Sequence, residues 1–176
     1  GPQVRLQYDD QPVGERVYVA MKPITASDGE PRIFVVERSP AQAVWWRAAA
    51  RCLHGGRLMG LDYGLTREEF FAPHRSAGTL RAYRAHRGVT DVLSSPGEQD
   101  ITAHVDFTAL QNAGEAEGLR TQALLPQATF LTRVAERTWL EPGGFGEWTP
   151  SRRRQFQTLT HPDHLGRAFR VLIQSR

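Results

Sequence analysis

The chain has 176 residues, of which 40% are hydrophobic and 23% charged, the composition of a globular domain large enough to hold an apolar core. No apolar run approaches the roughly 20 residues of a membrane-spanning helix, and no N-terminal stretch has the pattern of a signal peptide. The net charge is only +3, carried by 21 Arg and one Lys. Because basic residues do not interleave with aromatic ones along a strand, we expect no nucleic-acid binding. The lack of a long apolar run likewise leads us to expect no membrane span.

The first 37 residues are typical of short strands joined by turns. Val4–Tyr8 alternates weakly between apolar and polar residues, whereas Arg16–Met21 and Ile33–Val36 are rich in β-branched residues. Asp28-Gly29 between the last two runs indicates a turn. The sequence therefore predicts an antiparallel β-ribbon over residues 1–37.

From residue 38 the pattern becomes helical. Ser39 followed by Pro40 is typical of a helix start, and Gly55-Gly56 of a helix end. The residues between them predict one buried helix face, consisting of Ala41, Val44, Trp45, Ala48 and Cys52. Because Trp45 and Trp46 cannot both face the core of one helix, we expect one of them at an interface.

The next apolar run, residues 57–61, predicts a buried strand that stops at Asp62-Tyr63-Gly64. A helix, a glycine turn and a strand with polar residues at its C-terminal end make up half of a parallel α/β unit.

Downstream, Thr66 and Glu69 have the spacing of a capping box. Residues 79–86 fit either a helix or a strand. The remaining expectations are a turn at 94–97, a helix from Asp106 to Gly118, a strand at 121–125, a helix from Pro126, a Pro/Gly loop at 141–146, a helix from Thr149-Pro150 and a strand at 168–173.

The run Asp100 to Phe107 (Asp-Ile-Thr-Ala-His-Val-Asp-Phe) is the most specific feature of the sequence. It closely resembles a segment of the MidA family of S-adenosylmethionine-dependent methyltransferases, which includes bacterial proteins and a mitochondrial arginine methyltransferase needed for complex I assembly. Other blocks match in the same order from about residue 14 to 173: 14–17 loosely, then 62–64, 78–83 with His86, 96–97, 127–131 and 165–172.

The resemblance implies an α/β fold, the C-terminal part of a class I (Rossmann-like) methyltransferase sheet with an antiparallel ribbon and a mostly helical insertion. Residues 1–37 would be the ribbon, residues 38–176 the C-terminal part of the methyltransferase domain, and residues 65–125 within it a substrate-side insertion.

The family's Gly-rich cofactor loop has no counterpart in this sequence. Gly55-Gly56 ends a helix instead of starting one, and Gly143, Gly144 and Gly146 follow no strand. The family's acidic strand end and its Asn-Glu-Phe-Phe-Asp-Ala-Leu-Pro segment are also missing. We therefore expect S-adenosyl-L-methionine to be the cofactor of the full-length protein, and this chain alone to be an inactive fragment.

The resemblance also implies a partner and a location. The substrate would be a protein arginine, with a respiratory complex I subunit as one candidate, in the cytoplasm of a bacterium. A missing N-terminal half or a homo-oligomer partner would complete the site. The alternative is a non-catalytic protein-interaction module derived from the same fold.

Three residues are candidates for catalysis: Asp62, His104 and Asp106. Carboxylates can orient a guanidinium, and a histidine can take up its proton. Asp62 falls at a strand end, where ligands bind in open α/β sheets, and His104 could be oriented by Asp106 or Asp100. The structural alternatives are that Asp62 caps a turn or a helix and that Asp106 caps the helix beginning at Phe107.

The candidates for substrate binding are Tyr63, Arg81, Tyr83, His86, Asp100 and Thr102. Ordinary packing, a structural salt bridge for Arg81 and Tyr83, and a local backbone bond from Thr102 are the alternatives.

We expect no metal site. The single Cys52 excludes multi-cysteine zinc sites and is expected to be buried, and His161 and His164 lack a third ligand. The Arg152–Arg154 run fits either a solvated helix face or a docking patch.

Overall fold

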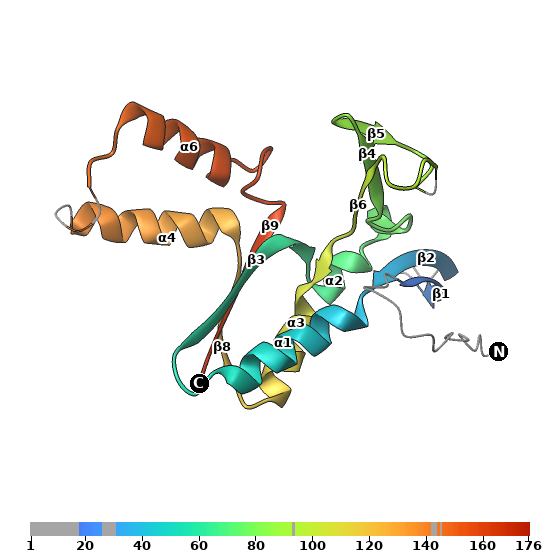
Figure 1. Cartoon of the computed structure of the whole chain (residues 1–176), viewed down its shortest axis with the longest axis horizontal. Coiled ribbons are helices and arrows are strands. Elements are labelled where there is room, and N and C mark those ends of the chain that lie inside the picture. Colours follow the sequence, from blue (N-terminus) through green and yellow to red (C-terminus); the bar gives the residue numbers. More distant parts are fainter. Residues whose placement is uncertain (1–17, 26–30, 93, 142–143, 145) are drawn as a thin grey trace.

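The computed structural model describes residues 18–25, 31–92, 94–141, 144 and 146–176. A four-stranded sheet crosses the molecule, and a smaller sheet and a ribbon stand to one side of it (Figure 1). The strand suggested at Val4–Tyr8 lies outside the described residues. Among the helices described, none is long and apolar enough to cross a membrane.

The predicted antiparallel pairing is confirmed for the described residues 18–25 and 31–38. Strands β1 (Tyr18–Thr25) and β2 (Pro31–Arg38) pair antiparallel, with Tyr18 opposite Arg38 and Thr25 opposite Pro31. The turn predicted at Asp28-Gly29 lies outside the described residues.

The main sheet has the order β7-β3-β9-β8. Its strands are β3 (Arg57–Leu65), β7 (Val105–Asp106), β8 (Arg120–Pro126) and β9 (Phe169–Ser175). Strand β9 runs antiparallel to both neighbours, whereas β7 runs parallel to β3 and pairs only with Gly64 and Leu65. Within the described ranges, residues 57–63 of β3 therefore have a strand partner on one side only.

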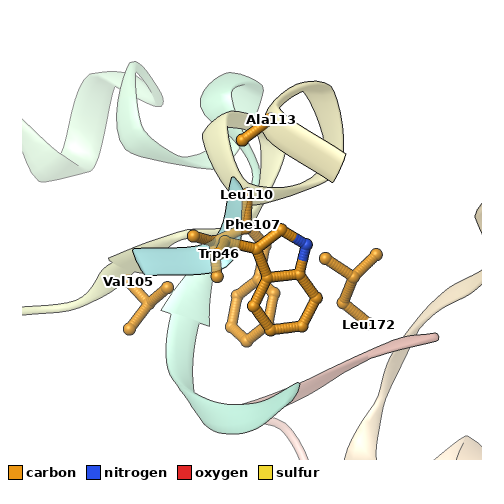
Figure 2. Close-up of a cluster of buried hydrophobic side chains, with 6 residues drawn as sticks. All are labelled: Trp46, Val105, Phe107, Leu110, Ala113 and Leu172. Atoms are coloured by element: carbon orange, nitrogen blue, oxygen red, sulfur yellow. The ribbon is translucent and has the colours of Figure 1, made fainter. Parts of the chain in front are cut away.

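Helices α1 (Pro40–Cys52) and α3 (Phe107–Ala116) pack together on one face of this sheet. Figure 2 shows the buried cluster between them and the sheet, in which the Trp46 indole lies beside Phe107 and Leu172. Gly60 lets the Trp46 ring lie close to β3, because a Cβ at position 60 would be only 2.9 Å from that ring.

The buried face predicted for α1 is wrong. Val44 and Trp45 are 57% and 65% exposed, and Ala48 and Cys52 are also exposed, whereas Trp46 and Ala50 are buried. Since this helix is apolar nearly all round, its spacing alone could not select the face that contacts the sheet. As expected, only one of the two tryptophans is in the core.

Gln174, on β9, is fully buried and ties the layers together. Its Oε1 accepts a hydrogen bond from Trp46 Nε1 at 2.7 Å. Its Nε2 donates to the Gln111 carbonyl and to Thr121 Oγ1, each at 2.9 Å. One amide side chain thereby joins α1, α3 and β8 to β9. Gly114 leaves room for it, because a Cβ there would overlap the Gln174 amide.

The strand predicted at residues 57–61 is present but is not fully buried. Leu58 and Gly60 face the helices, whereas Met59 and Leu61 on the other face are 56% and 43% exposed. The side chains of β3 therefore alternate between partly buried and exposed, because no described element covers this part of the second face of the sheet.

The segment between β3 and β7 also differs from the expected mostly helical insertion. After α2 (Arg67–Phe70), whose Thr66/Glu69 capping box is confirmed, and a 3-10 turn (Pro73–Arg75), it forms a three-stranded sheet. The strands are β4 (Arg81–Arg84), β5 (Arg87–Val89) and β6 (Asp100–Thr102), in the order β5-β4-β6. Such short, arginine-rich strands carry too little apolar alternation to be distinguished in a sequence.

The C-terminal elements agree with prediction. Helices α4 (Gln127–Leu140) and α6 (Pro150–Thr160) pack against each other, and α4 also contacts β8 and β9 (Figure 1). The Thr149 hydroxyl caps α6 by accepting from Arg152 N. Between the helices, the Trp148 ring contacts those of Trp139 and Phe156.

Replacing Gln174 by Leu tests its role in the fold. We expect Gln174→Leu to lower the free energy of unfolding by about 1–3 kcal/mol, because the Trp46 N–H would be buried without a partner, and the Gln111 carbonyl and the Thr121 hydroxyl would each lose a hydrogen bond. Chemical denaturation followed by tryptophan fluorescence measures the change. Gln122→Leu is the matched control: Gln122 is exposed and donates to Ser175, so its loss should stay within about 0.5 kcal/mol. Equal losses in the two variants would contradict the role of Gln174.

Candidate functional site

The end of β3 and the start of β7 bring the central candidates together. Gly64 pairs with Val105 in parallel register, so Asp62 and Tyr63, just before Gly64, approach His104, just before Val105. A Cβ on Gly64 would lie 2.7 Å from the Val105 carbonyl oxygen and would overlap the Phe107 ring. Only glycine therefore lets the strand end lie so close to the start of α3.

Tyr63 forms one wall of the site. Its ring lies against Phe169 of β9, with centroids 3.9 Å apart, and meets the His104 ring edge-on at 6.5 Å. The side chain remains 44% exposed. Tyr63 therefore both packs and presents a surface beside His104.

A hydrogen bond fixes the backbone of His104, and the surroundings of its side chain favour the uncharged imidazole. Its N–H donates to Thr79 Oγ1 at 3.0 Å. Burial, followed by the positive charges of Arg75 and Arg81, lowers the pKa of the imidazole below its ordinary 6.5, although Glu37 and Asp62 act in the opposite direction. At neutral pH the ring is therefore uncharged and able to accept a proton.

Asp62 has an exposed carboxylate beside a pocket. Its Oδ1 accepts the Tyr63 N–H at 2.7 Å. The pocket has a volume of about 300 Å³ and lies between the first turns of α1, the edge of β3 and the start of α3. Trp45, Trp46 and Phe107 contribute aromatic surface to its lining.

Asp106 caps α3, which is the structural alternative given for this residue in the sequence analysis. Its Oδ1 accepts the Ala109 N–H at 2.9 Å, and its Oδ2 lies 3.6 Å from Arg67 Nη2. In the described part of the chain, no hydrogen bond joins the His104 ring to Asp106 or Asp100. The carboxylates that act on its pKa belong to Glu37 and Asp62.

Four of the substrate-binding candidates lie on the small sheet. Arg81 is opposite Thr102, and Tyr83 is opposite Asp100, so each pair shares one exposed face. Arg81 is close enough to His104 to affect its pKa, and its Nη1 donates to the Leu80 carbonyl.

His86 is the candidate set apart from this group. It is exposed in the turn between β4 and β5 and has a positive φ of 63°. The length of β4 therefore separates it from the residues around His104.

Sequence reasoning missed three residues of the site: Glu37, Thr79 and Arg75. Glu37 is only 5% exposed and accepts hydrogen bonds from Thr79 and Leu80. Its position immediately before the Arg38-Ser39-Pro40 helix start gave no signal of burial. Thr79 lies within a block that carried the family resemblance, which was the one available clue.

Comparison with known proteins identifies the family. Residues 3–125 match a family described as putative S-adenosyl-L-methionine-dependent methyltransferases. The chain belongs to this methyltransferase family.

Two curated relatives of this methyltransferase chain are mitochondrial. The protein arginine methyltransferase NDUFAF7 of Xenopus tropicalis is 39% identical over 92 residues, which cover 51% of this chain and 19% of the relative. The Drosophila melanogaster homologue is 30% identical over 122 residues, covering 67% and 26%. The chain thus matches about a quarter or less of these relatives' length.

A solved structure extends the similarity to nearly the whole methyltransferase chain. A Burkholderia thailandensis protein crystallised with S-adenosyl-homocysteine superposes with a TM-score of 0.69 and 25% identity. The match covers 92% of this chain and 48% of that one. The α/β methyltransferase fold expected from the sequence is therefore confirmed.

The described residues of this chain do not by themselves form the usual cradle for adenosylmethionine. Such a cradle needs a glycine-rich turn from a strand into a helix, where the backbone can approach the ligand. In the strand-to-helix turns that the structure describes, the N-cap positions are occupied by Ser39, Thr66, Asp106 and Pro126, and none of these residues is glycine. The Gly143–Gly146 cluster lies partly outside the described residues.

The pKa of His104 can be measured directly. We expect an NMR titration of this chain to give a pKa below 6.5, because burial and the two arginines disfavour the cation. The stabilising effect of the neutral ring is then complete above pH 6.5 and declines as the pH falls from there through the lowered pKa. His104→Asn should abolish this part of the pH dependence of unfolding. A pKa at or above 6.5 would contradict the expectation.

Two substitutions separate the structural and chemical roles of Asp106. Asp106→Ala should lower the free energy of unfolding by about 1 kcal/mol because α3 loses its cap, whereas Asp106→Asn should retain nearly all of the stability, since asparagine caps equally well. Thermal unfolding measures both. An equal loss in the two variants would show that the charge, and not the cap, is what stabilises the fold.

Proposed function

We propose that this chain is the C-terminal portion of an S-adenosylmethionine-dependent methyltransferase that acts on a protein arginine. The observation that carries this proposal is the approach of the Tyr63 and His104 rings at the end of β3, with Asp62 near enough to act on the His104 pKa, in a chain of a methyltransferase family. Neutral His104 and the exposed Asp62 carboxylate are the two kinds of group that arginine modification requires.

In this proposal each residue has a separate task. Asp62 orients the guanidinium by charge-assisted hydrogen bonds. The guanidinium loses one proton when it becomes a neutral nucleophile, and a ring nitrogen of His104 accepts that proton. Tyr63, backed by Phe169, excludes water from one side. Holding the nucleophile in a dry, fixed position is the main means by which an enzyme accelerates an in-line displacement.

The cofactor would come with protein outside the described residues, because the described turns lack a glycine-rich cradle. We propose that an N-terminal half, or a homo-oligomer partner, docks along β3. The strand offers an unpaired edge at residues 57–63 in the described sheet, and exposed Met59, Leu61 and Trp45 lie on β3 and the neighbouring α1. Covering such an edge and such side chains is favourable in water.

The substrate side is proposed from position and from relatives. Residues 65–125 include the small sheet, whose exposed Arg81, Tyr83, Asp100 and Thr102 could contact a protein near His104. The named relatives are protein arginine methyltransferases, and a respiratory complex I subunit in a bacterial cytoplasm remains our candidate substrate.

A non-catalytic interaction module is the second candidate function. It is favoured by the exposed arginine run of α6, Arg152–Arg154, in a helix that contains no acidic residue. In that case the chain alone should be a stable monomer, whereas an enzyme portion with an open β3 edge should self-associate. Size-exclusion chromatography with light scattering distinguishes the two.

The first functional experiment is calorimetry with adenosylmethionine. We expect no binding to this chain at millimolar ligand, and clear binding to a longer protein that supplies the glycine-rich segment. Clear binding to the chain alone would contradict the proposed division of the cofactor site.

Activity of the longer protein then tests the residues. His104→Asn should lower kcat by roughly 10²-fold or more, the usual effect of losing a general base, and Asp62→Asn should also lower it. His164→Asn is the matched control, since His164 is exposed beyond α6. Equal rates for His104→Asn and the control would refute the role of His104.

A further inference from the structure

A buried carboxylate lies close to the site, and the proposed chemistry does not use it. Glu37, near the end of β2, is 5% exposed. In the described part of the chain, no ion pair to a lysine or arginine is found for it. Burying an unpaired carboxylate is expensive unless hydrogen bonds replace its water.

Three donors supply that replacement. Glu37 Oε1 accepts the N–H groups of Thr79 at 2.8 Å and Leu80 at 2.9 Å. Oε2 accepts the Thr79 hydroxyl at 2.9 Å. Both oxygens are thus engaged by the loop that leads into β4.

The loop is shaped to receive this carboxylate. Gly78 has a φ of +74°, and a Cβ there would overlap Glu37 Oε1. The Val35 N–H donates to the Ser76 carbonyl at 2.8 Å, which ties the same loop to β2 a second time. The segment 76–80 is therefore fixed to the ribbon on both sides of Gly78.

The hydrogen bonds continue to His104. The Thr79 hydroxyl, whose proton goes to Glu37, accepts the His104 N–H at 3.0 Å on its free lone pair. Because Glu37 can only accept, it fixes the direction of this relay. Thr79 is itself 3% exposed, so water cannot easily take over either bond.

We propose that Glu37 is a positioning residue that, through Thr79, holds His104 against Tyr63. This inference rests on the proposed function for the importance of His104, but the geometry that it describes can be tested without any methyl transfer. The charged groups that act on the ring are Arg75, Arg81, Glu37 and Asp62. Of the two carboxylates, Glu37 has all three of its hydrogen bonds directed into the loop, whereas Asp62 is exposed.

Three substitutions test the relay. Glu37→Gln places an NH₂ donor opposite the Thr79 hydroxyl and so reverses the direction of the hydrogen bond between these two side chains. Thr79→Val removes the hydroxyl but leaves Glu37 its two backbone donors, so a folded variant remains available if Glu37→Gln does not fold. Thr79→Ser retains the hydroxyl and is the conservative control.

The first readout is NMR of this chain. In the parent and in Thr79→Ser, we expect nuclear Overhauser contacts between the His104 and Tyr63 rings and slow exchange of the His104 amide. In Glu37→Gln and Thr79→Val, we expect the contacts to weaken and amide exchange to accelerate at least tenfold. Unchanged contacts and exchange in both variants would overturn the proposal, whatever the activity of the protein.

The second readout is kinetics of the longer methyltransferase. Glu37→Gln and Thr79→Val should each lower kcat about tenfold with little change in KM, whereas Thr79→Ser should keep the kcat of the parent protein. Unchanged kcat in these two variants, with His104→Asn impaired, would overturn the positioning role. Unchanged kcat in His104→Asn would instead refute the proposed function, while the NMR result would still decide the geometry.

Discussion

The arrangement of the main sheet and its helices depends on one buried amide, that of Gln174. The buried Trp46 N–H has its hydrogen-bond acceptor there, and the Gln111 carbonyl and the Thr121 hydroxyl each receive a hydrogen bond from the same side chain. The bond from Trp46 ties α1 to β9 at this point. Since the first turns of α1 form a wall of the pocket next to Asp62, a polar contact in the core determines the shape of the surface.

The site adds a second constraint, the close approach of β3 and β7. Two pairs of residues join these strands, and Gly64 leaves the room that the Phe107 ring at the start of α3 needs. From there the contacts spread outward, from Tyr63 to Phe169 on one side and to His104 on the other. The ribbon is connected to the same residue through Glu37, Thr79 and the backbone N–H of His104, so elements far apart in sequence converge on His104.

Much of the fold could be predicted from local signals. Ser39-Pro40, the Thr66/Glu69 box, Asp106 and Thr149-Pro150 each mark a helix start that the structure contains. Which side chains are buried was harder to predict, because burial depends on the element that packs against each residue. Helix α1 is apolar on most sides, and Met59 and Leu61 are exposed for lack of a described neighbour. Of the candidate site, Asp62, Tyr63 and His104 could be proposed from an expected strand end and a family block. Glu37 was not, because a buried charge leaves no periodic pattern.

Cys52 gives the chain a single natural site for chemical labelling. It is the single cysteine of the 176 residues and is exposed at the end of α1, whereas the beginning of the same helix lines the pocket. A maleimide dye or spin label can therefore be attached at one defined place without mutagenesis. Because the helix is a rigid rod of 13 residues, such a label would report on events at its far end from a distance that leaves the site undisturbed.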